Sequence, residues 1–297
     1  MPAPSRHARR ERDSTITDEQ QLQPPIHPKF GPLIETRLRV LTWNLWGRGG
    51  PWETRLAGIG ATLRAQQPDV VALQEVWEEE GGRAQASVLA EALGFHQVWA
   101  SRYAIDGVAI GNAILSRWPV LESETRPLPA PPERDELRNV TLARVDGPRG
   151  KFRIYTTHLN WRFDQSDVRQ EQVRSVARFI AETGGDQYPP ILTGDFNAVP
   201  DSDEIRMLTG RRAVGVPGLV FHDAWEAGGD GGPGFTWTNA NPWARQDLEP
   251  DRRIDYVLVG WPGKGGAGHV TSCRLVGEPV GGVYPSDHLG VVADLRY

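Results

Sequence analysis

Apolar and polar positions along the chain predict strands that alternate with helices. Short apolar runs predict strands at residues 39–43, 69–73, 111–116, 140–145, 152–157, 190–193, 254–259 and 291–295. Amphipathic spacing predicts helices at residues 52–67, 84–93 and 166–183, the last closed by Gly184-Gly185. Residues 122–138 and 239–253 are polar or rich in proline, and we interpret them as long connections.

The pattern also predicts the fold class. The strands at 140–145 and 152–157 flank the turn-forming segment 146–150, which indicates a hairpin and therefore a sheet that is not purely parallel. The other apolar runs are continuous, as in strands that are buried on both faces. We therefore expect an α/β sandwich with mixed sheets.

Composition and charge narrow the organisation of the chain. Residues 1–36 are rich in Pro, Gln, Asp, Glu and Arg and have little to bury, so we expect a disordered tail before one domain at residues 37–297. The net charge of −5 carries no strong basic signature of nucleic-acid binding. The single cysteine, Cys273, excludes an internal disulfide framework and fits a reducing, cytoplasmic compartment. No apolar run is long enough to span a membrane or to serve as a secretion signal, and we expect a monomer.

Short polar clusters mark the ends of the predicted strands. Their chemically useful members are Asn44, Glu75, His158, Asp195, Asn197, Asp255, Asp287 and His288. Oxygen donors select Mg²⁺, Mn²⁺ or Ca²⁺ over zinc, and no cysteine lies in these clusters. A bound cation, a group that orients water and donors toward developing charge are the parts that hydrolysis of a phosphate ester requires.

Each cluster has an ordinary structural interpretation when it is taken alone. Asn44 suits a turn after a strand, and Glu75 suits the positive end of a helix dipole. Asp195 and Asn197 suit an Asx turn, and His158 suits a hydrogen-bonded core position. Their joint occurrence at successive strand ends favours a site over a set of unrelated turns.

The motifs TWN, LQE, THL, GDFN, RIDY and SDH occur in this order, and together they resemble the endonuclease/exonuclease/phosphatase superfamily, whose fold is DNase I-like. The resemblance covers residues 39–297. It implies a four-layer sandwich, in which two mixed β-sheets pack face to face with helices outside, and a divalent-metal-dependent phosphoesterase. The implied ion is Mg²⁺, with Mn²⁺ or Ca²⁺ possible, in one or two copies.

The resemblance also implies roles for individual residues. Glu75 resembles the principal metal ligand, with Asn44 and Asp287 beside it. Asp195 resembles the residue that orients or deprotonates water, and Asn197 its partner. The remaining catalytic positions are His288, with Asp255 orienting its ring, and His158 as a second donor to the phosphoryl oxygens. Arg102, Tyr103 and Asn112 are candidate substrate contacts, together with Trp161 and Trp237, which lie beside motifs.

The substrate is left open between two classes of phosphodiester. A DNA endonuclease or exonuclease of the repair type would use arginines near the site. A sphingomyelinase-like enzyme would act on a phospholipid, and residues 235–258 resemble the corresponding stretch of neutral sphingomyelinases. A non-catalytic binding module has no chemical need for Asp195, Asp255 and His288 together.

Overall fold

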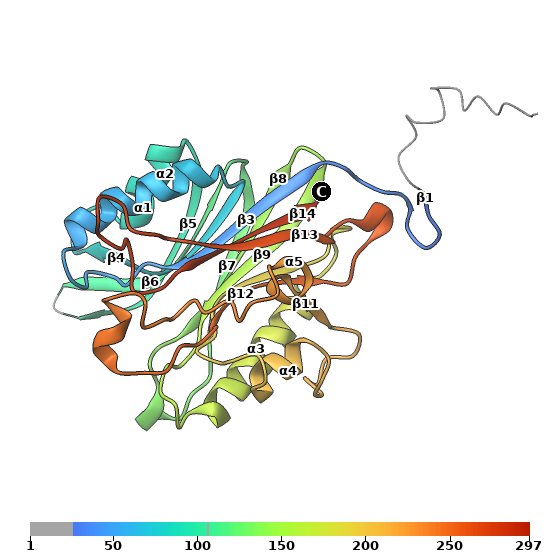
Figure 1. The fold of residues 1–297 in the computed structure, drawn as a ribbon. Coiled ribbons are helices and arrows are strands. Elements are labelled where there is room, and N and C mark those ends of the chain that lie inside the picture. Colours follow the sequence, from blue (N-terminus) through green and yellow to red (C-terminus); the bar gives the residue numbers. More distant parts are fainter. Residues whose placement is uncertain (1–25, 106) are drawn as a thin grey trace, which may run out of the picture.

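Two six-stranded mixed sheets form the centre of the molecule (Figure 1). The computed structural model describes residues 26–105 and 107–297. The first sheet has the order β13 (Val270–Val276), β14 (Gly290–Arg296), β3 (Arg37–Asn44), β4 (Val70–Glu79), β6 (Val108–Ser116) and β5 (His96–Ile105). The second has the order β11 (Phe221–Asp223), β12 (Asp255–Gly260), β10 (Ile191–Asp195), β9 (Gly150–His158), β8 (Asn139–Gly147) and β7 (Val120–Pro127).

Helices cover the outer faces of the two sheets and complete the four layers that the resemblance implied. Strands β3 and β4 send alternate side chains to opposite faces: Val40 and Val70 enter the core between the sheets, while Leu41 and Val71 pack outward beneath α1 (Trp52–Gln66) and α2 (Gln85–Leu93). A third cluster joins the second sheet to α3 (Ser166–Glu182) and α4 (Asp203–Leu208). The short helix α5 (Ala224–Gly228) packs beside β13.

The predicted strands correspond to the interior of both sheets, and the missed strands are their edges. All eight predicted runs match β3, β4, β6, β8, β9, β10, β12 and β14, each of which has a neighbour on both sides. Within these two sheets, the strands that were not predicted, β5, β7, β11 and β13, are the four edges. The interpretation of residues 122–138 as a connection was therefore wrong for β7, most of whose side chains are exposed. An edge strand with exposed side chains does not need a continuous apolar run.

Residues 26–36 make backbone contacts with the domain. They include the short strands β1 (Ile26–His27) and β2 (Gly31–Pro32), and the Ile34 N–H donates to Gly265 O at 2.9 Å. The division of the chain into a tail at residues 1–36 and a domain at residues 37–297 stays a prediction. Residues 1–25 lie outside the described part of the chain. Within the described residues, no helix is both long and apolar enough to cross a bilayer.

Two parallel strand pairs bring the polar clusters to one end of the sandwich. Strand β3 runs parallel to β4, and β10 runs parallel to β9 in the register Asp195↔His158. Strand β12 is antiparallel to β10, so that its first residue, Asp255, lies opposite Asp195. The sheet registers alone therefore place the side chains of three separate motifs together.

We expect Gly194→Ala to destabilise the protein and Gly60→Ala to stabilise it. Gly194 has φ 142°, and a Cβ there would lie 2.0 Å from Thr157 O on β9, so alanine should lower the free energy of unfolding by roughly 2–5 kcal/mol. Gly60 lies inside α1, where a Cβ meets its nearest atom at 3.6 Å, and alanine should add about 0.5–1 kcal/mol. Urea unfolding measures both, and unchanged stability in Gly194→Ala would contradict the close strand contact.

Candidate active site

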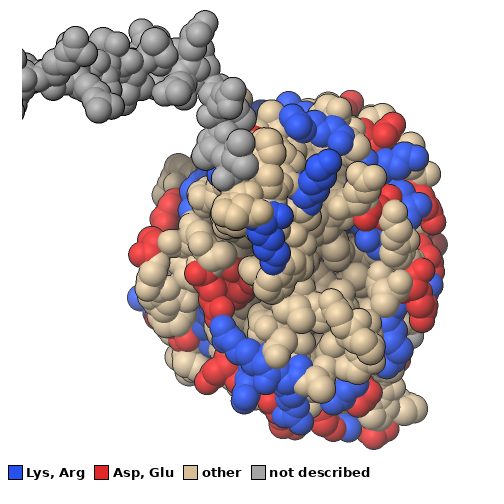
Figure 2. Space-filling model, turned by 90° about the vertical axis from the view of Figure 1, so that its right-hand side faces the viewer, with Lys and Arg blue, Asp and Glu red and all other residues tan. Residues whose placement is uncertain are grey.

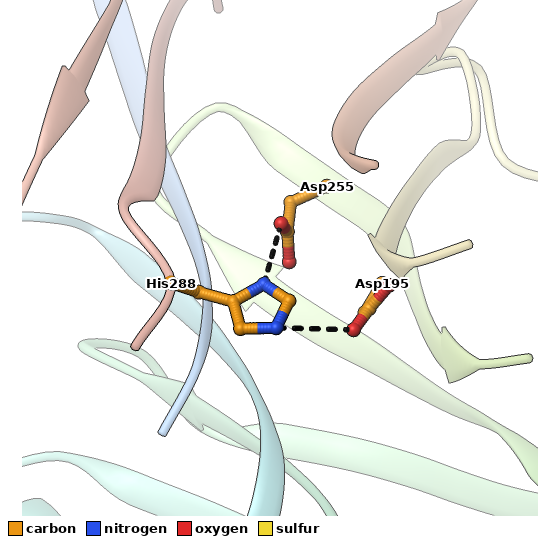
Figure 3. A group of neighbouring side chains, drawn as sticks. All are labelled: Asp195, Asp255 and His288. Atoms are coloured by element: carbon orange, nitrogen blue, oxygen red, sulfur yellow. Dashed lines mark hydrogen bonds and ion pairs between the residues drawn. The ribbon is translucent and has the colours of Figure 1, made fainter. Parts of the chain in front are cut away.

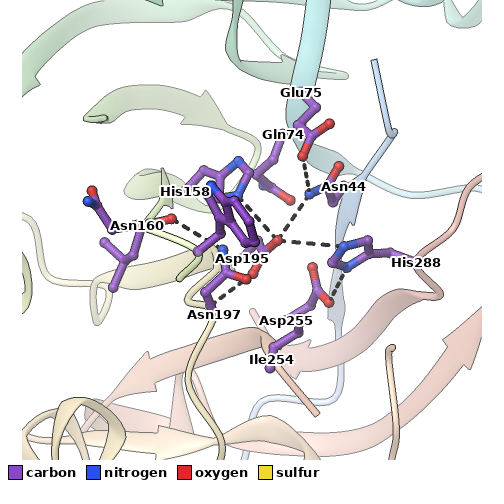
Figure 4. A network of polar contacts seen from close by, with 12 residues as sticks. Asn44, Gln74, Glu75, His158, Asn160, Asp195, Asn197, Ile254, Asp255 and His288 are labelled. Atoms are coloured by element: carbon purple, nitrogen blue, oxygen red, sulfur yellow. Dashed lines mark hydrogen bonds and ion pairs between the residues drawn. The ribbon is translucent and has the colours of Figure 1, made fainter. Parts of the chain in front are cut away.

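A single carboxylate oxygen, Asp195 Oδ2, lies at the centre of the polar site (Figure 4). The Asn44 side-chain amide donates to it at 3.0 Å. His158 Nε2 lies 3.4 Å from the same oxygen, and His288 Nε2 lies 3.7 Å away. The side chains of Asp195, Asn44 and both histidines are almost fully buried. The motifs at the ends of β3, β9 and β10 and before β14 therefore converge on one atom.

His288 connects this oxygen to a second carboxylate. Its Nδ1 is hydrogen-bonded to Asp255 Oδ2 at 2.9 Å, while Nε2 faces Asp195 (Figure 3). Burial acts to lower the pKa of His288, but Asp255, Asp287 and Asp195 outweigh it and raise this pKa well above its usual value. These carboxylates therefore favour the protonated imidazole, and the hydrogen bond to Asp255 fixes the orientation of the ring.

His158 has the opposite protonation tendency. Burial lowers its pKa well below the usual value, and the positive charges of Arg138 and His288 add to the shift. The contact with Asp195 at 3.4 Å is therefore not an ion pair, because the ring is neutral. Burial and the neighbouring Asp255 carboxylate raise the pKa of Asp195 to about 6. The site thus holds a carboxylate acceptor between a neutral and a charged imidazole.

Unusual backbone conformations position two of the predicted residues. Asn197 has φ 50°, and its N–H donates to Asp195 Oδ1 at 2.9 Å, which forms the Asx turn considered above. Glu75 has φ 53° and lies in an irregularity of the β4–β6 pairing between Leu73 and Val76. Left-handed backbone at a non-glycine residue is costly and persists where the surrounding structure enforces it. For Glu75 this conformation falls in the middle of β4, and for Asn197 it falls just after the end of β10.

Glu75 and Asp287 fit a divalent cation. Neither forms an ion pair within residues 26–105 and 107–297, although both line the same cleft. Burial raises the pKa of Asp287 to about 7, and repulsion from Glu75 adds to the shift against the opposing charge of His288. Two carboxylates that line one cleft and form no ion pair with any described residue are the kind of donors that hard cations prefer.

Asn44 and the three residues Asp195, Asp255 and His288 are less suited to bind a metal ion, because most of their polar atoms already have hydrogen-bond partners. The Asn44 amide nitrogen faces Glu75 Oε1 at 3.1 Å and Asp195, and its oxygen accepts from the Trp46 N–H at 2.9 Å. Asp195, Asp255 and His288 have ligand atoms within 4.8 Å of one another, as a cation site requires. Because His288 Nδ1 is engaged by Asp255, the hydrogen-bonded arrangement describes these three residues better than a metal cage does.

The predicted substrate contacts divide between the cleft and its walls. Trp161 and Trp237 both line the cleft, but Trp237 is buried with its ring 5.0 Å from the His288 ring. Asn112 is buried beside Glu75 and His158, and its amide donates to Asn139 Oδ1 at 2.8 Å. The backbones of Arg102 and Tyr103 belong to β5, and their side chains fall outside the described residues.

Arg55 is the main contributor that sequence reasoning missed. It is 1% exposed on α1, and its guanidinium donates to the backbone oxygens of Leu45, Trp46, Gly47, Gly49 and Pro285 at 2.8–3.1 Å. These acceptors belong to the two loops that carry Asn44 and Asp287. An arginine on a predicted amphipathic helix is ordinarily expected to be solvent-exposed. No signal in the sequence therefore marks Arg55 as a buried residue.

Thr236 and Asn241 hold two further segments of the site, the start of β12 and the loop that carries Asp287, and were also missed. Thr236 Oγ1 accepts from the backbone N–H groups of Ile254 and Asp255, at 3.1 and 3.2 Å. The Asn241 amide donates to Ser286 O at 2.8 Å and to Asp287 O at 3.0 Å. Both residues lie in the stretch that resembles neutral sphingomyelinases, but the resemblance gave neither of them a role, and only the three-dimensional contacts identify one.

The fold and the site together define a class, the four-layer α/β sandwiches with a polar site at the ends of the central strands. The profile described as "Endonuclease/Exonuclease/phosphatase family" matches residues 41–288, and the chain belongs to this family. The resemblance noted in the sequence is thereby confirmed.

The chain is similar in sequence to several named proteins, phosphodiesterases among them. The chain is 26% identical to a putative neutral sphingomyelinase of Drosophila melanogaster, over 59% of this chain and 42% of that protein. It is 25% identical to tyrosyl-DNA phosphodiesterase 2 of Gallus gallus, over 85% of this chain and 65% of the relative. The solved TDP2 of D. rerio with a single-strand DNA product matches with TM-score 0.68 and 25% identity, covering 89% of this chain and all of that one. The chain spans 28% to 65% of the length of the curated relatives it matches.

We expect Arg55→Lys to loosen the site. A single ammonium cannot reach five carbonyl oxygens, so the free energy of unfolding should fall by about 2–4 kcal/mol. The matched control is Arg64→Lys at an exposed position of the same helix, which should stay within about 0.5 kcal/mol of the wild type. Chemical denaturation of both variants measures the difference, and equal stabilities would remove Arg55 from the positioning role.

We expect Mg²⁺ to raise the melting temperature and Glu75→Gln to weaken this effect. Cation binding stabilises the folded state by RT ln(1 + [Mg²⁺]/Kd), about 2.7 kcal/mol at a hundred times Kd. Loss of one carboxylate should raise the Mg²⁺ concentration for the half-maximal shift by about tenfold or more. Glu53→Gln, exposed on α1, is the control. An unchanged titration in Glu75→Gln would remove Glu75 from the ligand set.

Proposed function

We propose that the protein is a divalent-metal-dependent phosphodiesterase that hydrolyses its substrate by in-line attack of water. One observation carries the proposal: Asp195 Oδ2 is approached by Asn44, His158 and His288 in the cleft that Glu75 and Asp287 line. Such a site holds an acceptor for the proton of water beside donors for the phosphate charge. The family membership supports the same reaction class.

The proposed roles follow the protonation tendencies of the side chains. Asp195 orients water and accepts its proton, while Asn197 holds the carboxylate through its backbone N–H. His288 donates from Nε2 to a phosphoryl oxygen, and Asp255 keeps its ring charged and oriented. The neutral His158 is the second donor. Glu75 and Asp287, with Asn44 beside them, would hold a cation that neutralises charge on the phosphate.

Nucleic acid is the first candidate substrate. The cleft has a volume of about 570 Å³ and presents Arg138 and Arg252 beside Trp46 and Trp161. Arginines match phosphates and exposed tryptophan stacks on bases, so a strand end would find both kinds of contact. The likeness to tyrosyl-DNA phosphodiesterase 2 over 85% of the chain supports this choice.

A phospholipid is the second candidate, and the exposed apolar side chains near the cleft favour it. Trp161 is 47% exposed, Phe163 56% and Leu248 88%. Arg252 lies over the Phe163 ring at 4.4 Å, so the loops that carry these residues are neighbours. Apolar residues on adjoining loops can enter a lipid interface. The likeness to the putative neutral sphingomyelinase supports this reading.

The finer assignments remain part of this proposal. Mg²⁺ is the proposed ion, with Mn²⁺ or Ca²⁺ as alternatives, and one or two ions are compatible with the carboxylates at the site. A cytoplasmic monomer is the accompanying prediction. The burial of Cys273, which raises the pKa of its thiol to about 12, supports its role as an inert core residue.

We expect Asp195→Asn and His288→Ala to lower kcat by about 10²–10⁴-fold with Mg²⁺ present, because each removes a group that acts on the reacting atoms. His222→Ala is the control, since its ring packs against Trp261 outside the cleft. Circular dichroism checks that the variants fold. Wild-type turnover in both site variants would remove the assigned roles.

A substrate panel separates the two candidates. The wild type and Asp195→Asn are assayed on DNA carrying one abasic site, on single-strand DNA, and on a choline-phosphodiester lipid in detergent micelles, each with Mg²⁺ or EDTA. Cleavage of DNA alone, lost with EDTA and in the variant, supports the nucleic-acid reading. Cleavage of lipid alone supports the interface reading, and no cleavage of any phosphodiester would contradict the proposed function.

A further inference from the structure

A second cavity lies at the opposite end of the sandwich from the catalytic cleft. It has a volume of about 670 Å³, within the range of sites for small molecules. Its walls include Gly150 at the start of β9 and Tyr188 just before β10. The catalytic His158 ends β9, eight residues after Gly150, which at about 3.3 Å per residue is roughly 26 Å away. Both sites can therefore be occupied at the same time.

Three cations from two separate loops line this cavity. Arg149 and Lys151 come from the β8–β9 hairpin, and Lys264 comes from the turn η4 (Lys264–Gly266). Within the described part of the chain, none of the three forms an ion pair. Most other arginines of this acidic protein are paired with carboxylates. Unpaired like charges that meet around one cavity repel each other unless an anion lies between them.

Among the described residues that line the cavity, Asp186 is the acidic side chain, and its charge is already neutralised. Asp186 Oδ2 lies 3.1 Å from Arg144 Nε and 3.2 Å from Arg153 Nε. It therefore has no need of Arg149, Lys151 or Lys264 as partners. Figure 2 views this end of the molecule, where several blue side chains, with red ones among them, surround a tan, uncharged surface.

Aromatic rings supply the apolar part of the wall. Tyr188 and Tyr297 are buried with ring centroids 5.2 Å apart, and Phe30 is half-buried beside them. The tyrosine hydroxyls are already committed, Tyr297 to Gly150 O at 2.6 Å and Tyr188 to Arg296 O at 2.9 Å. Because the hydroxyls are engaged elsewhere, the parts of these rings that line the cavity are apolar, which suits a flat, weakly polar group.

We propose that this cavity is a binding site for a small phosphorylated ligand with a planar ring, a mononucleotide in chemical class. The phosphate lies among Arg149, Lys151 and Lys264, and the ring lies against Phe30, Tyr188 and Tyr297. A doubly charged phosphate monoester uses several cations, whereas a single carboxylate would leave cations without a partner. The site is separate from the catalytic cleft and does not depend on the proposed function.

Calorimetric titration of the full chain tests the site, with AMP as the probe and with EDTA present so that metal-dependent binding in the cleft is suppressed. We expect AMP to bind, and ribose 5-phosphate and adenosine to bind at least tenfold more weakly, because each lacks one of the two matching parts. The double variant K151A/K264A should bind AMP at least tenfold more weakly. Both lysines are exposed, so the variant should fold, which a thermal melt verifies.

Two controls locate the binding. Arg178→Ala removes one exposed cation from α3, and Arg252→Ala removes one from the catalytic cleft; both should keep the wild-type affinity for AMP within twofold. No binding of AMP, or binding that is lost in Arg252→Ala and kept in K151A/K264A, would overturn the site. Equal affinities for AMP and ribose 5-phosphate would overturn the assigned ligand class.

Discussion

The structure depends on keeping one carboxylate charged in a buried position. Asp195 has almost no contact with solvent, and an uncompensated charge there would be very unfavourable. Compensation comes from Asn44 on the first sheet, from His158 on the second, and from His288 in the loop before β14. The interactions that stabilise this charge therefore tie together the two sheets at one end. Moving any one of these elements would remove a partner of the buried carboxylate.

The layer beneath the site reinforces this junction. The Gln74 amide donates to Thr42 Oγ1 at 3.1 Å and to Thr156 Oγ1 at 2.9 Å, so it joins β4 to a neighbour in its own sheet and to β9 in the other. The Trp43 indole donates to His288 O at 2.9 Å and so anchors the loop before β14 to β3. Such fully bonded polar groups select one packing of the sheets, since any alternative leaves buried donors unsatisfied. The rigidity that catalysis needs and the specificity of the fold thus have a common origin.

The two ends of the sandwich differ in chemistry because different residue types lie there, carboxylates at one end and cations with aromatic rings at the other. At the catalytic end, carboxylates cluster, and the backbone adopts costly conformations at Glu75 and Asn197. At the other end, glycines and short turns leave an open cavity with aromatic walls and unpaired cations. The same strands, β9 and β10, connect both ends. A ligand at the second cavity would therefore rest on the elements that carry His158 and Asp195.

Much of this arrangement was determined locally by the sequence. The eight interior strands were recognisable because a strand with neighbours on both sides and packed faces must be apolar almost throughout. The four edge strands were not recognisable, because a single neighbour and an exposed face permit polar residues, as in β7. The core of the site was recognisable for a related reason. The proposed chemistry requires particular residue types, and most of these lie in short motifs at the ends of the interior strands.

Only the tertiary structure decided which residues hold the site in place. Arg55, Thr236 and Asn241 act through hydrogen bonds to backbone atoms that lie far from them in sequence, as with Arg55 and Pro285 O. A backbone carbonyl is present at every residue, so nothing in the sequence of the acceptor marks it. The convergence of Arg149, Lys151 and Lys264 on one cavity likewise depends on how distant loops meet. Motifs are local and can be read from the chain, whereas these contacts exist only once the two sheets have packed.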